Sequence, residues 1–247
     1  MAEEFNLDGK IALVVGGGQS WLEPIAISLF EAGATVITLS QGEKQMALLS
    51  DLAVKRNRAV KIVNSNLLDH QRVNKIIEEE ILNWGKIDIL VNSLNIRFAK
   101  PLIEVADNEW QKLITTNLTT VFTTCRVVGK QMLRQKAGKI INVTTCLGER
   151  GLPNCTAYCA AAGGVIQFSR ALALEWAKSG ITVNAVTLGW IFEPPEIPDE
   201  RIARYIPTKR YGRPEELTPL VVYLASSASD WITGQVYSVD GGVMGHS

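Results

Sequence analysis

The chain has 247 residues, of which 47% are hydrophobic, and its 25 basic and 25 acidic residues cancel to a formal net charge of zero. A chain of this length and composition can bury a sizeable core, and one α/β domain over residues 1–247 is the simplest expectation. The sequence has no run of Lys or Arg to attract a phosphate backbone or an anionic membrane surface. The composition therefore argues against nucleic acid and membrane as partners.

The N-terminal segment and the cysteines indicate a cellular compartment. The first ten residues, MAEEFNLDGK, are acidic, and the apolar run IALVV that follows is too short for a signal-peptide core or a membrane span. The four cysteines, Cys125, Cys146, Cys155 and Cys159, lack the paired spacing and nearby histidines of a zinc site. We expect reduced thiols, no bound metal and a cytoplasmic location.

Short apolar runs rich in Val and Ile recur along the chain. Each run has the length and composition of a buried strand. The predicted strands lie at 10–15, 34–39, 59–63, 87–92, 139–144, 181–186 and 235–240.

Longer amphipathic stretches separate these runs and predict helices. Strict alternation of strand and helix favours a three-layer, doubly wound Rossmann-like α/β fold with a seven-stranded parallel sheet. One irregular stretch, residues 187–200, contains prolines that rule out a continuous helix or strand. It is either a loop over a binding site or a surface crossover. The predicted helices lie at 21–32, 43–56, 70–84, 107–135, 157–178 and 214–226.

Several segments resemble the short-chain dehydrogenase/reductase family in order and spacing. They are GKIDILVN, NEWQKLITTNLTTVF, GKIINVTT, GERGLPNCTAY, GITVNAV and DWITGQVYSVDGG. The segments LGERGLPN and RYGRPEELTPLVVYLASSASDWITGQ are most similar to the gluconate 5-dehydrogenase and 3-oxoacyl-carrier-protein reductase branches. The resemblance covers the whole chain. It implies an oxidoreductase fold that passes a hydride between a nicotinamide and a carbonyl or alcohol carbon.

The resemblance also implies a catalytic constellation. It assigns the family's tyrosine to Tyr158, the serine that orients the carbonyl to Thr145, and the asparagine of the proton relay to Asn117. The lysine that assists the tyrosine is replaced by Ala162, which shares a helix face with Tyr158. An unassisted tyrosine, with a pKa of about 10, is a poor general acid at neutral pH, and a poorly matched acid costs about 10²- to 10⁴-fold in rate. Arg150, on a nearby loop, is an alternative source of positive charge.

The glycine-rich turn that contacts the cofactor pyrophosphate is altered. The family's T-G-x-x-x-G-x-G becomes VGGGQSWL, which keeps Gly16 but places Ser20 and Leu22 at the other two glycines. Those glycines normally let the backbone and a helix N-terminus approach the phosphates closely. Trp21, between the two substituted positions, is large enough to fill part of the nicotinamide site or to pack in the core.

Other expected cofactor contacts are changed as well. Ser40 stands where an acidic residue would bind the ribose, and the adenine-side aspartate of the family becomes Asn66. The family's N-N-A-G motif is altered to N-S-L-N, from Asn92 to Asn95. Glu193 stands at the threonine of the carboxamide loop. These changes predict that no cofactor binds tightly, with NAD or NADP expected only if the chain is an active oxidoreductase. The remnant of the cofactor site is Gly16, Ser20, Asn66 and Asn92.

The leading hypothesis is a pseudo-enzyme, inactive or very weak, that serves as a binding or assembly subunit. The resemblance implies dimers through helices 107–135 and 157–178 and tetramers through the last strand, formed with itself or with an active related subunit. The sequence also leaves open a small-molecule ligand as a partner. The alternatives are an NAD(P)-dependent oxidoreductase of a sugar acid, polyol or 3-oxoacyl substrate, and a cofactor-independent enzyme on the same fold. A thiol nucleophile at Cys155 or Cys159 is least favoured, because no histidine is placed to activate it.

Overall fold

A seven-stranded sheet forms the centre of the computed structural model, which describes residues 3–17, 19–41, 46–192 and 199–245. Its strands are all parallel and follow the order β3-β2-β1-β4-β5-β6-β7. The predicted three-layer, doubly wound architecture is confirmed. The strands are β1 (Ile11–Gly17), β2 (Thr35–Gln41), β3 (Val60–Asn64), β4 (Ile89–Ser93), β5 (Gly138–Thr145), β6 (Ile181–Leu188) and β7 (Val236–Val239).

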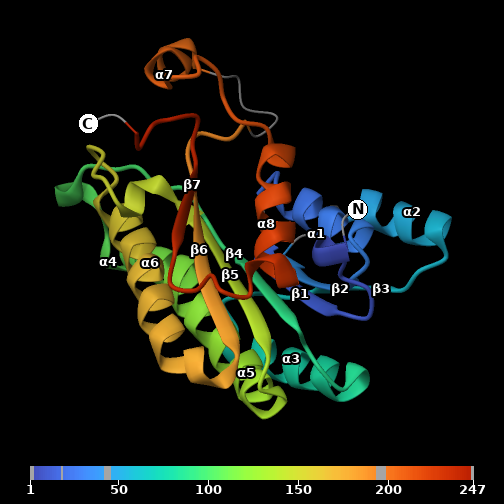
Figure 1. The fold of residues 1–247 in the computed structure, drawn as a ribbon. Helices are drawn as coiled ribbons and strands as arrows, with labels where there is room; N and C mark the ends of the chain where they lie inside the picture. The colour runs from blue at the N-terminus through green and yellow to red at the C-terminus, as the bar shows by residue number, and fades with distance from the viewer. Residues whose placement is uncertain (1–2, 18, 42–45, 193–198, 246–247) are drawn as a thin grey trace.

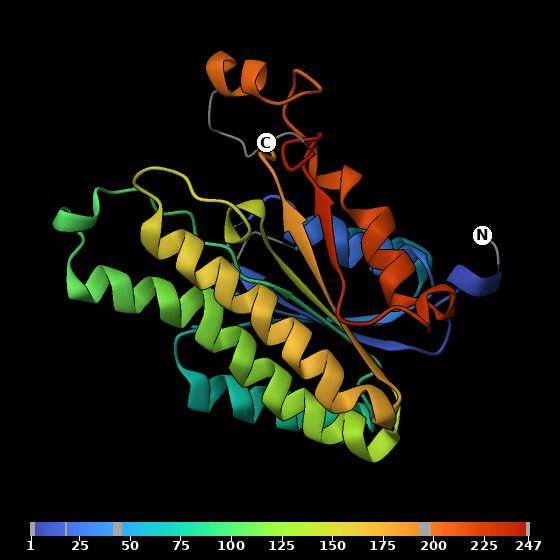
Figure 2. The same cartoon turned by 60° about the vertical axis from the view of Figure 1, so that its left-hand side comes forward.

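Helices cover both faces of the sheet, as Figures 1 and 2 show. The central strands are apolar on both faces because each face packs against helices. In β5, Ile140 joins the core on one side while Ile141 joins the core on the other. One layer contains α1 (Leu22–Glu31), α2 (Ala47–Arg56) and α8 (Thr218–Ala225), and the other contains α3 (His70–Trp84), α5 (Thr120–Gln135) and α6 (Thr156–Trp176).

The predicted helix at 107–135 is interrupted in the structure. It consists of α4 (Asp107–Ile114), a π-helical turn (Thr115–Thr119) and α5. A π turn inserts an extra residue into the helix and lengthens the spacing of its hydrogen bonds. The hydroxyl of Thr120 donates to the carbonyl of Thr115 at 2.9 Å. This turn presents Asn117 to the segment that follows β4.

One difference from the predicted elements falls near the carboxyl edge of the sheet. A short helix, α7 (Glu200–Tyr205), lies above this edge in Figure 1 and was not predicted. The prolines of the preceding stretch hid it, although Asp199 caps it by accepting from the backbone N–H of Arg201. Residues 193–198 of the predicted loop and 43–45 of the predicted second helix lie outside the described residues.

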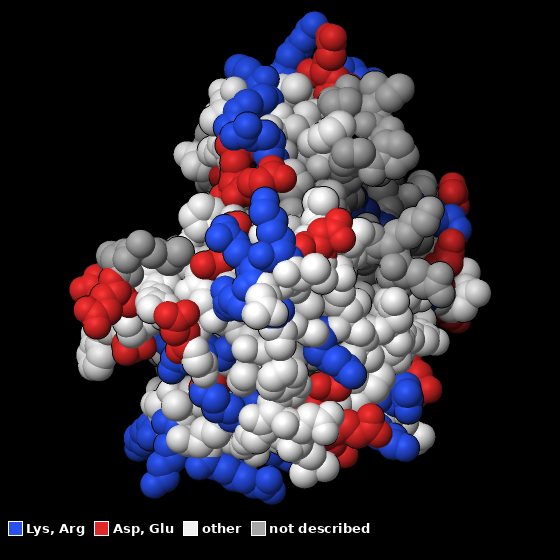
Figure 3. Space-filling view, turned by 90° about the vertical axis from the view of Figure 1, so that its right-hand side faces the viewer, with Lys and Arg blue, Asp and Glu red and all other residues white. Residues whose placement is uncertain are grey.

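Charged side chains of both signs lie on the face shown in Figure 3. In Figure 3, Lys and Arg side chains are interspersed with Asp and Glu over the visible face. Within the described residues, no helix combines the length and apolarity needed to cross a bilayer.

We predict that the sheet centre is sensitive to truncation. Ile141 is fully buried on β5, so Ile141→Ala should lower the free energy of unfolding by about 2 to 5 kcal/mol through lost burial and a residual cavity. Urea denaturation of both variants measures the effect. Ile103 is 95% exposed, so Ile103→Ala is the matched control and should change little. Equal losses in the two variants would contradict the packing described.

Candidate active site

A pocket of about 320 Å³ lies at the carboxyl ends of β4, β5 and β6. This is the edge at which parallel α/β sheets bind their ligands. The pocket brings together two of the residues that the sequence suggested as catalytic, Thr145 and Tyr158. Its described lining residues are Trp21, Asn95, Arg97, Phe98, Ala99, Thr145, Cys146, Leu147, Leu152, Cys155, Tyr158, Gly189, Trp190, Ile202 and Tyr211.

Tyr158 projects into this pocket from the first turn of α6 and is 5% exposed. Its hydroxyl donates a hydrogen bond of 2.5 Å to Oδ1 of Asn95. Burial raises the pKa of Tyr158 to about 12, even though hydrogen bonding with Thr145 and Asn95 and the charge of Arg97 lower it. Tyr158 is therefore a neutral phenol whose proton is directed at Asn95.

The cation that acts on Tyr158 is Arg97, which follows β4. Arg97 is exposed at the mouth of the pocket, and its guanidinium donates to the carbonyl oxygen of Ile191 at 3.1 Å. The proposed substitute, Arg150, donates instead to the carbonyl of Val243 and lies over the ring of Tyr205. Ala162, at the family's lysine position, is buried one turn along α6 from Tyr158.

Thr145 ends β5 beside Tyr158 and is engaged by the backbone. Its hydroxyl donates to the carbonyl of Leu188 at 3.3 Å and accepts from the N–H of Leu147 at 3.3 Å. A hydroxyl in this state has limited capacity to donate to a substrate oxygen, because its one proton is already committed. Thr145 retains the position of the family's serine, with its hydroxyl held by the loop after β5.

Asn117 is placed by the π turn outside the lining of the pocket. Its side chain makes two hydrogen bonds of 2.9 Å with the backbone of Ile96, one to the carbonyl and one from the N–H. Asn117 therefore anchors the segment after β4. Its assignment to a proton relay remains a prediction.

The β1–α1 turn carries large side chains where the family has glycines. A methyl group at Gly16 would lie 2.4 Å from the carbonyl oxygen of Ser93 and 2.7 Å from Leu22, so both crowd this position. Trp21 is buried in the pocket wall, and its indole N–H donates to the Ser93 hydroxyl at 3.0 Å. Ser20 donates to the carbonyl of Phe192 at 3.2 Å.

The remaining predicted contacts are dispersed. Asn92 is fully buried in a network in which its amide donates to Asn142 at 2.8 Å and its oxygen accepts from Thr124 at 2.7 Å. Asn66 is exposed, and its side chain accepts from the N–H of Leu68. Neither residue lines the pocket that contains Tyr158. Glu193 lies outside the described residues.

The cysteines beside Tyr158 are poor nucleophiles. Burial raises the pKa of Cys155, and it raises the pKa of Cys146 to about 11. A thiol with a raised pKa is protonated at neutral pH, whereas the thiolate is the nucleophile.

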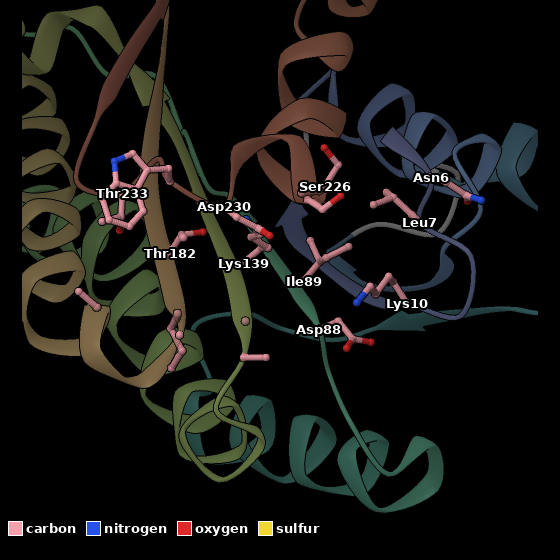
Figure 4. Close-up of a pocket in the computed structure, with 18 residues that line it drawn as sticks. Asn6, Leu7, Lys10, Asp88, Ile89, Lys139, Thr182, Ser226, Asp230 and Thr233 are labelled. Carbon is pink, nitrogen blue, oxygen red and sulfur yellow. The ribbon is translucent and has the colours of Figure 1, made fainter. Parts of the chain in front are cut away.

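A second, larger cavity of about 810 Å³ lies at the opposite edge of the sheet, at the amino ends of the strands (Figure 4). Its charged side chains are largely paired. Lys139 contacts Asp230 at 2.7 Å, and Asp88 accepts from Lys86 at 2.9 Å and from the N–H of Ile11 at 2.8 Å. None of the predicted catalytic residues lines it. The smaller pocket is therefore the candidate active site.

Comparison with known proteins identifies the family. A family model described as enoyl-(acyl carrier protein) reductase matches residues 23–244. The chain is 36% identical over 243 residues to a 3-oxoacyl-acyl-carrier-protein reductase of Vibrio harveyi, covering 96% of this chain and 98% of that protein. It is 32% identical over 246 residues to the 2-dehydro-3-deoxy-D-gluconate 5-dehydrogenase of Dickeya dadantii, covering 96% of each. The chain belongs to the short-chain dehydrogenase/reductase family of oxidoreductases.

A solved relative corrects our expectation about the cofactor. The chain superposes with a TM-score of 0.91, at 30% identity and 99% coverage of both chains, on a gluconate 5-dehydrogenase from Burkholderia cenocepacia in complex with NADP and tartrate. The expectation that no cofactor binds is therefore wrong. It weighed changed side chains, whereas the backbone supplies much of a dinucleotide site.

The described residues fit a dinucleotide in part. Gly16 keeps its place near the carboxyl end of β1, and the N-terminus of α1 lies at the same edge of the sheet. The side chains of Leu22 and Trp21 narrow the adjoining space. Gly16 and the first turn of α1 are thus the residues that would hold a pyrophosphate group.

Sequence reasoning missed two residues of the site, Asn95 and Arg97. Asn95 was noted only as the position of a lost glycine, whereas its new side chain binds Tyr158. Arg97 follows the matched motif, so no family position drew attention to it. Two signals were available in the sequence. Asn95 is a polar residue at a glycine position of the family, and Arg97 is a cation two residues later.

We predict that Tyr158 makes folding stability fall in alkaline solution. Its pKa is about 12 when folded and about 10 when unfolded, so the folded protein binds more protons between these values and its free energy of unfolding decreases as pH rises. The loss by pH 12 should be about 3 kcal/mol. Urea denaturation across this window should show a smaller decrease for Tyr158→Phe. Parallel decreases in both proteins would contradict the raised pKa.

Proposed function

We propose that the chain is a nicotinamide-dependent oxidoreductase in ancestry with strongly reduced turnover, which acts mainly as a ligand-binding subunit. The observation that carries this proposal is the state of Tyr158. It is buried, its O–H is directed at Asn95, and no cation stands at Ala162. The proposal keeps one part of the pseudo-enzyme hypothesis, the low turnover. It drops the other part, the expectation that no cofactor binds.

Proton transfer is the step that these residues impair. When bound, a reduced nicotinamide supplies a hydride to a carbonyl carbon, and the carbonyl oxygen must then receive a proton. Tyr158 would have to leave Asn95 to give that proton and would become a phenolate in a buried site. Burial disfavours the phenolate, as the pKa of about 12 indicates. Such a mismatch between donor and working pH costs about 10²- to 10⁴-fold in rate.

An active oxidoreductase is the second candidate. Thr145 and Tyr158 still face one pocket, and the charge of Arg97 lowers the pKa of Tyr158 against the effect of burial. The names of the relatives support a 3-oxoacyl or sugar-acid substrate for this candidate, with NADP or NAD as cofactor. Under this candidate, Arg97 takes over part of the role of the family's lysine.

Self-association is part of the proposal. The outer faces of α5 and α6 carry exposed apolar side chains, with Phe122 42%, Leu133 38% and Leu174 81% exposed. Such side chains on neighbouring helices support pairing with a second copy or with an active relative. We propose a dimer or tetramer in the cytoplasm.

We predict that Ala162→Lys raises the turnover of the purified protein by about 100-fold or more, because a cation one helical turn from Tyr158 stabilises its phenolate. NADPH- and NADH-dependent reduction of 3-oxoacyl thioesters and 5-ketogluconate measures the rate. Ala162→Met, which has comparable length and no charge, is the control.

Dinucleotide binding should be titrated in parallel for all three proteins. A wild-type turnover number of about 10 s⁻¹, the median for enzymes, would overturn the proposal. An equal gain from Lys and Met would show that packing at 162, rather than charge, limits the rate.

A further inference from the structure

Asn95 adds a polar side chain to the pocket at a position where the family motif ends in glycine. It follows β4 by two residues, is 5% exposed and lines the 320 Å³ pocket together with Tyr158. Because glycine has no side chain, this substitution brings into the pocket an amide that the family motif does not supply. The bonding of that amide decides what it can do for a ligand.

The oxygen and the nitrogen of the Asn95 amide differ in their bonding. Oδ1 accepts the hydroxyl proton of Tyr158 at 2.5 Å, and this bond orients the amide. Nδ2 carries two N–H donors, and it bonds no residue that the structure describes. Nor is Nδ2 sealed inside the protein, since the buried side-chain atoms without a partner in the described chain belong to Thr38, Asn74 and Thr182. The amide nitrogen is therefore accessible to a ligand in the pocket.

Several other side chains of the pocket already donate to groups of the protein. A hydroxyl or indole group has one proton, so it must break its existing bond before it can donate to a ligand. An amide nitrogen without a partner gains a bond and breaks none. The committed donors and their acceptors are Tyr158 to Asn95, Thr145 to Leu188, Trp21 to Ser93 and Tyr211 to Asp199.

The walls of the pocket determine which ligand suits this donor. Trp21, Phe98 and Trp190 line it, and aromatic walls favour apolar groups. The volume of about 320 Å³ is close to the lower end of ligand pockets, roughly 300 to 1,000 Å³. A carbonyl oxygen accepts a hydrogen bond and brings no proton that needs an acceptor of its own. A compact, mostly apolar carbonyl compound fits both the walls and the donor.

We infer that Asn95 binds the carbonyl oxygen of a compact apolar ketone or aldehyde through its amide nitrogen, while Tyr158 keeps its proton on Oδ1 of the same amide. The family's tyrosine, in contrast, exchanges its proton with this oxygen. Since Nδ2 and Oδ1 share one carbon atom, the bound oxygen lies beside the phenol but outside its hydrogen bond. The inference rests on the proposed function, because an oxygen held by a neutral amide is bound without receiving a proton.

Ligand-observed NMR titration of the full chain with acetophenone and α-methylstyrene tests the inference. The two probes have nearly the same shape, but a CH₂ group replaces the carbonyl oxygen in α-methylstyrene. The ratio of the acetophenone affinity to the α-methylstyrene affinity therefore isolates the contact with the oxygen. Asn95→Leu removes the amide and should lower this ratio about fivefold or more. Asn95→Asp keeps an acceptor for Tyr158 but lacks the N–H donors, so it should lower the ratio by a similar factor.

Three further variants test the other donors of the pocket. Tyr158→Phe should lower the affinity ratio by about twofold at most, because the phenol proton is already committed to Asn95. Trp190→Phe removes an indole N–H from the lining, and Arg97→Met removes a guanidinium. Both should likewise change the ratio by about twofold at most. Circular dichroism should show that each variant is folded, and either Asn95 variant suffices if the other does not fold.

The inference is overturned if Tyr158→Phe, Trp190→Phe or Arg97→Met lowers the ratio more than the Asn95 variants do. It is also overturned if neither Asn95 variant lowers the ratio, or if neither probe binds. These are binding results and do not depend on turnover. If the ratios follow the expected order and the wild type turns over at an ordinary rate, only the proposed loss of activity fails. If Tyr158→Phe has the largest effect while wild-type turnover is low, only the inferred contact fails.

Discussion

The candidate active site is held together by residues 93–97, which comprise the last residue of β4 and the segment after it. Each of four positions bonds a different wall: Ser93 accepts from Trp21, Asn95 accepts from Tyr158, Ile96 pairs with Asn117, and Arg97 donates to Ile191. Because β4 lies between β1 and β5, this segment reaches both halves of the sheet. The positions of Trp21 and Tyr158 are therefore coupled through three consecutive residues, 93–95.

The balance of forces on Tyr158 follows from this arrangement. Burial raises the pKa of Tyr158 by more than the hydrogen bonding with Thr145 and Asn95 and the charge of Arg97 together lower it. An exposed guanidinium at the pocket mouth is screened by water, so its effect on a buried phenol is modest. A lysine at 162 would share a helix face with Tyr158 and act at shorter range. The location of the positive charge, rather than its presence, distinguishes this site from the family pattern.

Periodicity and the family resemblance predicted most of the fold. All seven strands follow from runs of Val and Ile, and the Tyr158–Thr145 juxtaposition follows from their places on α6 and β5. The π turn and α7 escaped prediction because local side-chain bonds at Thr120 and Asp199 define them, and such bonds leave no periodic signal. The sequence also did not show where the side chain of Asn92 points, because an amide can line a cleft or join a buried hydrogen-bond network.

The cofactor expectation failed for a reason that bears on how altered motifs are interpreted. The replacements at glycine positions were weighed as obstacles to a cofactor, but each replacement also adds a side chain that makes contacts of its own. Asn95 binds Tyr158, Leu22 packs against Gly16, and Trp21 forms part of the pocket wall. These additions narrow the ligand space from several sides. The substitution at Asn95 thus changes the pocket lining and the bonding of Tyr158 together, which a count of lost family contacts does not predict.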